Sequence, residues 1–288
     1  MHKSRKYVYI CNIPRDIMKR SESGSGWEKV PAIRLIVTKR ISIGPGGSYA
    51  WNQTGNKGPY WRIYWNDSPG SFISCGGEEI ELNPQRVVAL SPDATYSTRA
   101  EKLVKHFYVH CFVSQPFSEI KGKMFLLKGY ELAKKAAYLS SKVNKDSDAT
   151  RIQMELLVYL NSVLLAIPPN CIPKYTPYDP KVAKAIKILE NHQKISNADL
   201  AQRVGMSRNG FLFLFKKVTN FSPQVYSRQL RINEACIMLN HSNRSIDEIA
   251  LETGFCDRYH FSRAFRQVIG YAPGQFRSRA CRYPNISR

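Results

Sequence analysis

The sequence predicts a multidomain α+β protein, with a β-barrel or jelly roll at the N-terminus, then a helical hairpin, then an all-α C-terminal domain. Three observations support this prediction. Short apolar and aromatic runs alternate with Gly, Pro, Asn and Asp over residues 7–113, apolar residues recur at three- and four-residue intervals after residue 123, and one segment near the C-terminus occurs twice. The first pattern is typical of strands and turns, and the second is typical of helices.

These patterns divide the 288 residues into four parts. Residues 1–120 are predicted to form a β-rich domain and residues 121–167 a helical hairpin. Residues 168–180 contain five prolines in thirteen positions, which excludes a helix or a central strand and marks a linker. Residues 181–288 are predicted to be entirely helical.

The strand predictions for the first part depend on runs of five to eight residues bounded by turn residues. Breaks such as Gly44-Pro45-Gly46-Gly47 and Ser91-Pro92-Asp93 separate these runs. Their number favours a barrel or a sandwich. The clearest runs are Ile33 to Val37, Tyr60 to Trp65, Arg86 to Leu90 and His106 to Val113.

The hairpin prediction depends on two helical patterns, Met124 to Val143 and Ala149 to Ile167, separated by a polar segment. The second pattern has a wide apolar stripe that includes Leu156, Tyr159 and Val163. Such a stripe packs on the core of its own domain, on the same helix of a second chain, or on both. A homodimer is therefore one expectation for this segment.

The formal net charge of +21 indicates a polyanionic partner. Positive charge is densest in the C-terminal part, which contains 18 Lys and Arg but only 7 Asp and Glu from Lys181 onward. The seven cysteines form no C-x-x-C pair, which favours a reducing compartment. No stretch has the length or composition of a signal peptide or membrane span, so we expect a cytoplasmic protein with no membrane partner.

The C-terminal part contains an internal repeat. Leu200-Ala201-x-x-Val204-Gly205 is matched 49 residues later by Ile249-Ala250-x-x-Thr253-Gly254, and one extra residue then makes the offset 50. The further matches are Ser207 with Asp257, Phe211 with Phe261, Phe215 with Phe265, Lys216 with Arg266, Val218 with Val268, Phe221 with Tyr271 and Pro223 with Pro273.

Each copy is predicted to be a helix-turn-helix unit. Gly205 and Gly254 permit the sharp turn, while Ser207 and Asp257 can cap the second helix. The spacing Ser245-x-x-Glu248 is that of a capping box. Phenylalanines four residues apart anchor each second helix and leave the opposite face exposed.

The exposed face of each second helix carries chemistry suited to double-stranded DNA. Arginine binds guanine edges with two hydrogen bonds, and Tyr, Ser and Lys reach phosphates. In the first copy, Leu212 and Phe213 could contact thymine methyl groups or pack against the N-terminal domain when DNA is absent. The predicted DNA-contacting residues are Arg208, Asn209, Leu212, Phe213, Lys216, Arg258, Tyr259, Ser262, Arg263 and Arg266.

The second copy resembles a known family. Its segments Gly254-Phe255-Cys256-Asp257-Arg258-Tyr259-His260-Phe261-Ser262-Arg263-Ala264-Phe265-Arg266 and Gly270-Tyr271-Ala272-Pro273-Gly274-Gln275-Phe276-Arg277 are similar to the C-terminal signature of AraC-type bacterial transcription regulators. The resemblance covers roughly residues 180–280. It implies two units joined by a long helix, at about Ser222 to Leu239, that places both second helices in successive major grooves.

The same resemblance implies more for the whole chain. Members of this length carry an N-terminal cupin-like domain that binds a sugar or related metabolite, followed by a hairpin that dimerises. They act on RNA polymerase, commonly as activators. The expected partners are therefore double-stranded DNA, a small-molecule effector such as a sugar, RNA polymerase and a second copy of the chain.

The N-terminal domain offers aromatic residues beside an arginine, a combination that can stack on a sugar ring and bind its hydroxyls. Strand alternation places Trp61, Ile63 and Trp65 on one face and Tyr60, Arg62 and Tyr64 on the other. Either face could line the interior. The candidate ligand-binding residues are Trp51, Trp61, Arg62, Tyr64, Trp65 and His106.

The sequence indicates no metal site, cofactor or enzyme activity. His106 and His110 share a strand face, but no further ligands stand at fitting spacings, and no catalytic motif is present. Two alternatives to a ligand-responsive regulator stay open. One is a constitutive DNA-binding regulator whose β-domain only dimerises, and the other is a DNA-modifying enzyme, for which Cys11, Cys75 and Cys111 lack an activating motif.

Overall fold

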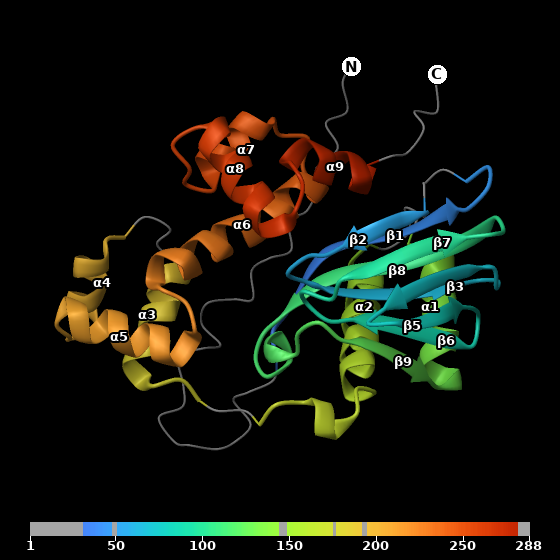
Figure 1. Ribbon diagram of the computed structural model, residues 1–288, viewed down its shortest axis with the longest axis horizontal. Coiled ribbons are helices and arrows are strands. Elements are labelled where there is room, and N and C mark those ends of the chain that lie inside the picture. The colour runs from blue at the N-terminus through green and yellow to red at the C-terminus, as the bar shows by residue number, and fades with distance from the viewer. Residues whose placement is uncertain (1–30, 48–50, 144–148, 175–176, 192–194, 282–288) are drawn as a thin grey trace. The chain divides into compact units, whose positions relative to one another are not determined.

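The computed structural model describes residues 31–47, 51–143, 149–174, 177–191 and 195–281. The N-terminal domain consists of two antiparallel sheets, and helices follow it (Figure 1). The first thirty residues of the predicted β-domain lie outside the described ranges. The nine strands are β1 (Ile33–Ile43), β2 (Gln53–Asn56), β3 (Trp61–Asn66), β4 (Ser71–Cys75), β5 (Glu78–Leu82), β6 (Arg86–Leu90), β7 (Tyr96–Ala100), β8 (Val104–Val113) and β9 (Met124–Lys128) within those ranges.

One sheet has five strands in the order β1-β8-β3-β6-β9, and the other has four in the order β2-β7-β4-β5. The inner faces of the two sheets share one apolar cluster, which includes Ile36, Ile73 and Leu82. The four strands predicted from the sequence are confirmed as β1, β3, β6 and β8.

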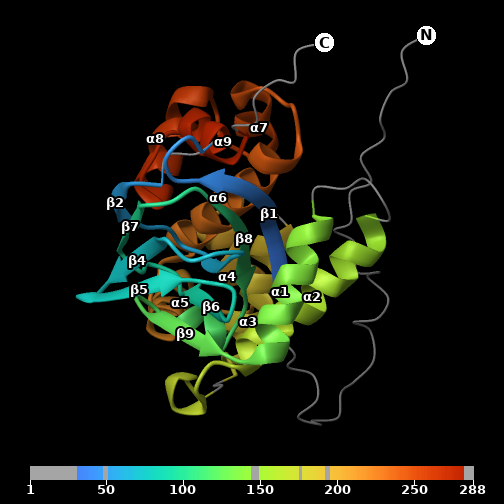
Figure 2. The ribbon, with the colours of Figure 1, turned by 90° about the vertical axis from the view of Figure 1, so that its right-hand side faces the viewer.

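The helical hairpin covers the outer face of the five-stranded sheet (Figure 2). Its helices are α1 (Tyr130–Lys142) and α2 (Ala149–Leu165). Trp61, Ile63 and Trp65 lie in the cluster that these helices form with the sheet. Because β3 is covered on both faces, all six of its residues are buried.

The predicted start of the hairpin is wrong. Residues Met124 to Lys128 form β9, which pairs antiparallel with β6, and the first helix begins only at Tyr130. Met-Phe-Leu-Leu is a continuous apolar run, and such a run has the same pattern in a buried strand and in a buried helix. Gly129, with a φ of 158°, separates the strand from the helix.

The remaining helices form the C-terminal domain. They are α3 (Pro180–Asn191), α4 (Asn197–Arg203), α5 (Arg208–Thr219), α6 (Pro223–His241), α7 (Ile246–Glu252), α8 (Arg258–Ile269) and α9 (Pro273–Cys281). The long connecting helix is confirmed as α6, which begins after its cap Ser222. None of the helices in the described ranges combines the length and apolar character needed to cross a membrane.

Helix α6 packs on strand β1 of the N-terminal domain. Glu234 accepts a hydrogen bond from Arg34 at 2.5 Å, and the Nε2 of His241 lies 2.5 Å from the carbonyl oxygen of Ile36. Residues of α6, α7, α8 and α9 belong to the same apolar cluster as the inner faces of the sheets. The first helix-turn-helix unit has its own cluster, which includes Val182, Leu200 and Phe211.

Candidate functional site

The repeated segments fold into two matching helix-turn-helix units, α4 with α5 and α7 with α8. Both turns use a glycine with positive φ, at 67° for Gly205 and 79° for Gly254. Only glycine takes this conformation at little cost. The residue after each glycine donates its backbone N–H to the equivalent alanine carbonyl, at 3.0 Å in the first turn and 2.9 Å in the second.

The predicted caps are confirmed in both units. The Ser207 hydroxyl accepts a hydrogen bond from the backbone of Gly210 at 3.3 Å, and Asp257 accepts one from the backbone of His260 at 2.6 Å. This backbone donor lowers the pKa of the Asp257 carboxyl. The capping box of Ser245 and Glu248 is also present. Local sequence therefore determines where each second helix begins.

Paired phenylalanines attach each second helix to its own core. The rings of Phe211 and Phe215 lie 5.5 Å apart, as do those of Phe261 and Phe265, and all four are fully buried. The opposite face of each helix therefore points to solvent.

On α8 this exposed face is basic. Arg258, Tyr259, Arg263 and Arg266 are exposed and Ser262 is half-buried. Tyr259, Ser262, Arg263 and Arg266 also border one shallow depression of the surface. Arg258 forms an ion pair with Asp247 of α7 at 3.3 Å.

On α5 the equivalent face is mixed. Arg208, Asn209, Phe213 and Lys216 are exposed, and the Phe213 side chain is 72% exposed. Leu212 is half-buried and packs on the core of its own unit. Phe213 is thus an apolar side chain presented to solvent on this helix, whereas Leu212 is divided between the core and the surface.

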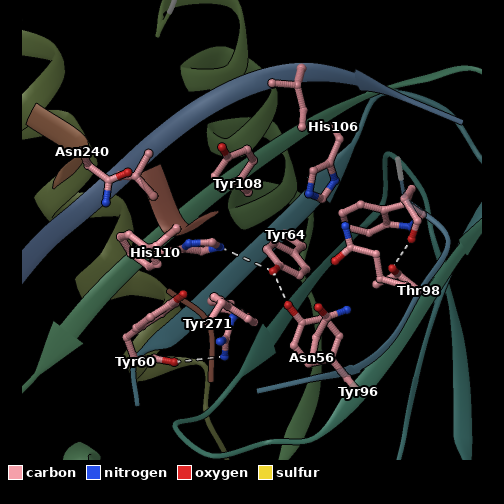
Figure 3. Close-up of a pocket in the computed structure, with 16 residues that line it drawn as sticks. Asn56, Tyr60, Tyr64, Tyr96, Thr98, His106, Tyr108, His110, Asn240 and Tyr271 are labelled. Carbon is pink, nitrogen blue, oxygen red and sulfur yellow. Dashed lines mark hydrogen bonds between the residues drawn. The ribbon is translucent and has the colours of Figure 1, made fainter. Parts of the chain in front are cut away.

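A cavity lies between the two sheets and the C-terminal domain (Figure 3). Its volume is about 90 Å³, several times the roughly 10–15 Å³ that one water molecule needs. The described residues that line it are Val37, Ile41, Trp51, Gln53, Asn56, Tyr60, Arg62, Tyr64, Tyr96, Thr98, His106, Tyr108, His110, Asn240, Tyr271 and Phe276. The last three belong to the C-terminal domain.

The cavity wall is organised by hydrogen bonds and aromatic contacts. The Tyr64 hydroxyl lies 2.9 Å from that of Tyr96 and 3.4 Å from Nε2 of His110, as the dashed lines in Figure 3 show. The Arg62 guanidinium lies 4.3 Å from the ring centre of Tyr60 and 5.3 Å from that of Tyr96. These contacts stabilise a buried cation without an acidic partner.

Comparison with known proteins identifies the C-terminal domain. A family model described as a helix-turn-helix domain matches residues 200–279. Over 101 residues the chain is 34% identical to the HTH-type transcriptional regulator ArgR of Pseudomonas aeruginosa, covering 34% of this chain and 31% of ArgR. It is also 34% identical over 101 residues to the transcriptional activator RhaS of Escherichia fergusonii, covering 34% of this chain and 36% of RhaS. The C-terminal domain of the chain is therefore an AraC-type helix-turn-helix domain.

Two further comparisons extend over more of the chain. The uncharacterized HTH-type transcriptional regulator YidL of Escherichia coli is 24% identical over 217 residues, covering 73% of this chain and 72% of YidL. A solved structure of ToxT from Vibrio cholerae matches with a TM-score of 0.53 at 14% identity, covering 85% of this chain and 97% of ToxT. The likeness to ToxT supports the two-domain fold. The matches to ArgR and RhaS span only about a third of those proteins.

The structure brings together four of the six predicted ligand residues. Trp51, Arg62, Tyr64 and His106 line the cavity. The predicted alternation along β3 is confirmed, because Tyr60, Arg62 and Tyr64 share the cavity face.

Trp61 and Trp65 do not line the cavity. They lie on the other face of β3, where Trp61 donates to the carbonyl of Phe117 at 3.3 Å and Trp65 donates to that of Pro84 at 3.1 Å. The reason is the two-residue period of the strand, which turns every second side chain toward the helical hairpin.

Sequence reasoning missed several residues of the cavity, including Tyr96, Asn240, Tyr271 and Phe276. Tyr96 lies on β7 of the opposite sheet, and the other three lie more than a hundred residues further along the chain. Only the tertiary fold brings them to Arg62, so no local pattern could have identified them.

The two histidines of the cavity are neutral. Burial lowers the pKa of His106 to about 3. Burial, followed by the nearby Arg62 cation, keeps the pKa of His110 well below its ordinary value. Within the described ranges, no three His, Cys, Asp or Glu side chains are grouped as a metal site would require.

Proposed function

We propose that the chain is an AraC-type transcription activator whose affinity for its operator changes when a small molecule fills the cavity. The observation that carries the proposal is the mixed wall of that cavity, in which Asn240, Tyr271 and Phe276 of the DNA-binding domain face Arg62 and Tyr64 of the β-domain. An occupant of this space contacts both domains, so its binding energy depends on how they pack. The proposed effector is a sugar or a related metabolite.

Operator recognition is assigned to the exposed faces of α5 and α8. On α8 we propose that Arg258, Arg263 and Arg266 contact guanine edges or phosphates, and that Tyr259 and Ser262 contact phosphates. On α5 the polar contacts come from Arg208, Asn209 and Lys216. Phe213 contacts thymine methyl groups, and Leu212 supports it from the core of its unit.

A homodimer completes the proposal. The exposed face of α2 carries Met154, Leu157, Val158 and Leu165, between 43% and 83% exposed. Leu157 and Val158 follow Met154 by three and four residues and Leu165 follows Val158 by seven, so all four lie along one side of the helix, as in a packing seam. We propose that the same face of a second copy covers them, that the dimer binds two half-sites, and that it acts on RNA polymerase in the cytoplasm.

The DNA-binding part of the proposal is tested with Arg263. DNA fragments bound by the purified full chain are selected from genomic DNA, and the affinity for the best fragment is measured by fluorescence anisotropy. Because Arg263 is exposed on the face of α8 that we assign to DNA, replacing it with alanine is expected to weaken binding by about 1–3 kcal/mol. Affinity for that fragment is also expected to fall steeply with salt, since phosphate contacts release counterions.

The matched control is Arg99→Ala, which removes an exposed arginine from strand β7. This variant is expected to bind as the unmodified chain does. Equal affinities for the Arg263 and Arg99 variants would show that α8 does not contact DNA in the way proposed.

A further inference from the structure

Four residues that line the cavity each have a buried polar atom with no hydrogen-bond partner among the described residues. These atoms are Nε1 of Trp51, Nη2 of Arg62, Nε2 of His106 and Oδ1 of Asn240. Trp51, Arg62 and His106 are more than nine-tenths buried, with exposed fractions of 7%, 1% and 1%. Buried polar atoms in proteins normally have a partner, because leaving one unsatisfied costs free energy. Their grouping around one cavity indicates a ligand that supplies the partners.

Two of the four atoms are donors. The indole N–H of Trp51 can only donate, and the Arg62 guanidinium is a permanent cation with five N–H donors. Nη1 of Arg62 donates a long hydrogen bond of 3.5 Å to the carbonyl of Tyr60. None of the described residues that line the cavity is an aspartate or a glutamate. A buried cation with no internal counter-charge favours an anionic ligand.

The other two atoms are acceptors. Oδ1 of Asn66, whose Nδ2 donates to Ser71, lies 2.7 Å from Nδ1 of His106, so Nδ1 carries the proton. The neutral ring of this cavity-lining residue therefore has a bare Nε2 that can accept a hydrogen bond. Asn240 uses its Nδ2 to donate to the carbonyl of Cys236 at 2.8 Å, which leaves Oδ1 as an acceptor. A ligand that satisfies both atoms must also carry hydroxyl or N–H donors.

The apolar and aromatic residues of the cavity wall narrow the chemical class of the ligand further. Only Val37, Ile41 and Phe276 among the described lining residues are hydrocarbon side chains, which disfavours an acyl chain. The tyrosine and tryptophan rings offer faces on which a sugar ring can stack. The single guanidinium matches one negative charge, whereas a phosphate dianion would leave excess charge buried.

We infer that the effector is a sugar acid, a small polyhydroxylated carboxylate of the uronate or aldonate class. Its carboxylate accepts from Arg62 and Trp51, and its hydroxyls donate to His106 and Asn240. This inference rests on the proposed function, because it takes the cavity to be the effector site.

The test is isothermal titration of the full chain with matched compounds. D-Galacturonate, D-glucuronate and D-gluconate are compared with D-galactose and D-glucose, which lack the carboxylate. Cyclohexanecarboxylate lacks the hydroxyls, and glucose 6-phosphate carries a dianion. At least one sugar acid is expected to bind tenfold or more tightly than every compound of these comparison groups, and to change affinity for the selected DNA fragment.

Two variants locate the binding. Arg62→Gln removes the cation, and Gly58→Ala adds a Cβ that would overlap Nη2 of Arg62 and so displaces the guanidinium while keeping its charge. Both are expected to weaken sugar-acid binding at least tenfold. Arg99→Gln, at an exposed position of the four-stranded sheet, is expected to bind normally. Thermal melting without ligand identifies any variant that fails to fold. If one of the two cavity variants fails to fold, the other tests whether Arg62 binds the sugar acid.

Each contrary outcome has a distinct meaning. Binding of neutral sugars, of cyclohexanecarboxylate or of the phosphate as tightly as the sugar acids overturns the inference while leaving a ligand-responsive regulator in place. Sugar-acid binding that survives in a folded Arg62 or Gly58 variant also overturns it. If no sugar acid binds while the same preparation binds its DNA fragment, the inference fails and DNA recognition stands.

Discussion

His106 illustrates how burial determines the chemistry of one side chain. It is 1% exposed, and its Nδ1 is held by Asn66. Burial lowers its pKa to about 3, against about 6.5 for an unfolded histidine. Between these two values the unfolded chain binds more protons than the folded one. The contribution of the neutral His106 to the free energy of unfolding is therefore fully present above about pH 6.5 and is lost as the pH falls toward 3.

A pH-dependent stability follows from this residue. Lowering the pH from 7 to 5 is expected to reduce the free energy of unfolding, with His106 contributing up to about 2 kcal/mol at about 1.4 kcal/mol per pH unit. Urea unfolding at both pH values, for the unmodified chain and for His106→Gln, measures this contribution. The variant is expected to lose less stability on acidification. An identical loss in both proteins would contradict the buried, neutral histidine.

At single positions, the sequence predicted chemistry better than location. The face shared by Tyr60, Arg62 and Tyr64 followed from strand alternation alone. Whether that face or the one with Trp61 points to the cavity did not follow, because β3 is buried on both sides. An amphipathic strand would have distinguished the two faces, but a wholly buried one has no polar side to identify.

Helix starts and turns were predictable because their signals are local. Ser207, Asp257 and the glycines of the two turns act on backbone groups within a few residues, so a short motif is sufficient. Strand β9 was not predictable in this way. Its identity depends on pairing with β6, more than thirty residues earlier, and its apolar run fits either structure.

Helix α2 provides a test of the proposed dimer. Val158 is 62% exposed at the middle of the apolar face, so replacing it with glutamate would place a charge in the proposed seam. Val158→Glu is expected to convert a dimer into a monomer in sedimentation velocity experiments at micromolar concentration. Ser162→Glu, one turn further along, replaces an exposed side chain that is already polar and lies to one side of the apolar face, so it is expected to weaken the dimer less.

Two results would contradict this assignment. A chain that sediments as a monomer before any substitution has no such dimer. A dimer that persists unchanged in Val158→Glu uses another surface.

The two helix-turn-helix units differ in what they pack against. The core of the second unit is continuous with that of the β-domain, whereas the first unit has a separate apolar cluster. Elements that share a core unfold together, and elements with separate cores can open independently. The second unit is therefore expected to unfold with the sheets, and the first unit on its own.

Matched phenylalanines allow this difference to be measured. Phe265→Leu and Phe215→Leu remove similar volume from fully buried positions of the repeat, each at a cost on the order of 1–3 kcal/mol. Phe265→Leu is expected to speed hydrogen exchange in both α8 and the sheets. Phe215→Leu is expected to speed exchange in α3 to α5 and in the first turns of α6, whose Tyr226 contacts Phe215, but not in the sheets. Equal effects of both variants on the sheets would show that the cores are not separate.

Helix α6 provides Asn240 to the cavity wall and also connects the two helix-turn-helix units. If a compound in this cavity changes the affinity of the protein for its operator, then the operator must change the affinity of the protein for the compound by the same factor. Protein bound at a promoter and protein free in the cell are then half-saturated at different concentrations of the same metabolite. A dose–response curve measured on free protein would not describe the promoter.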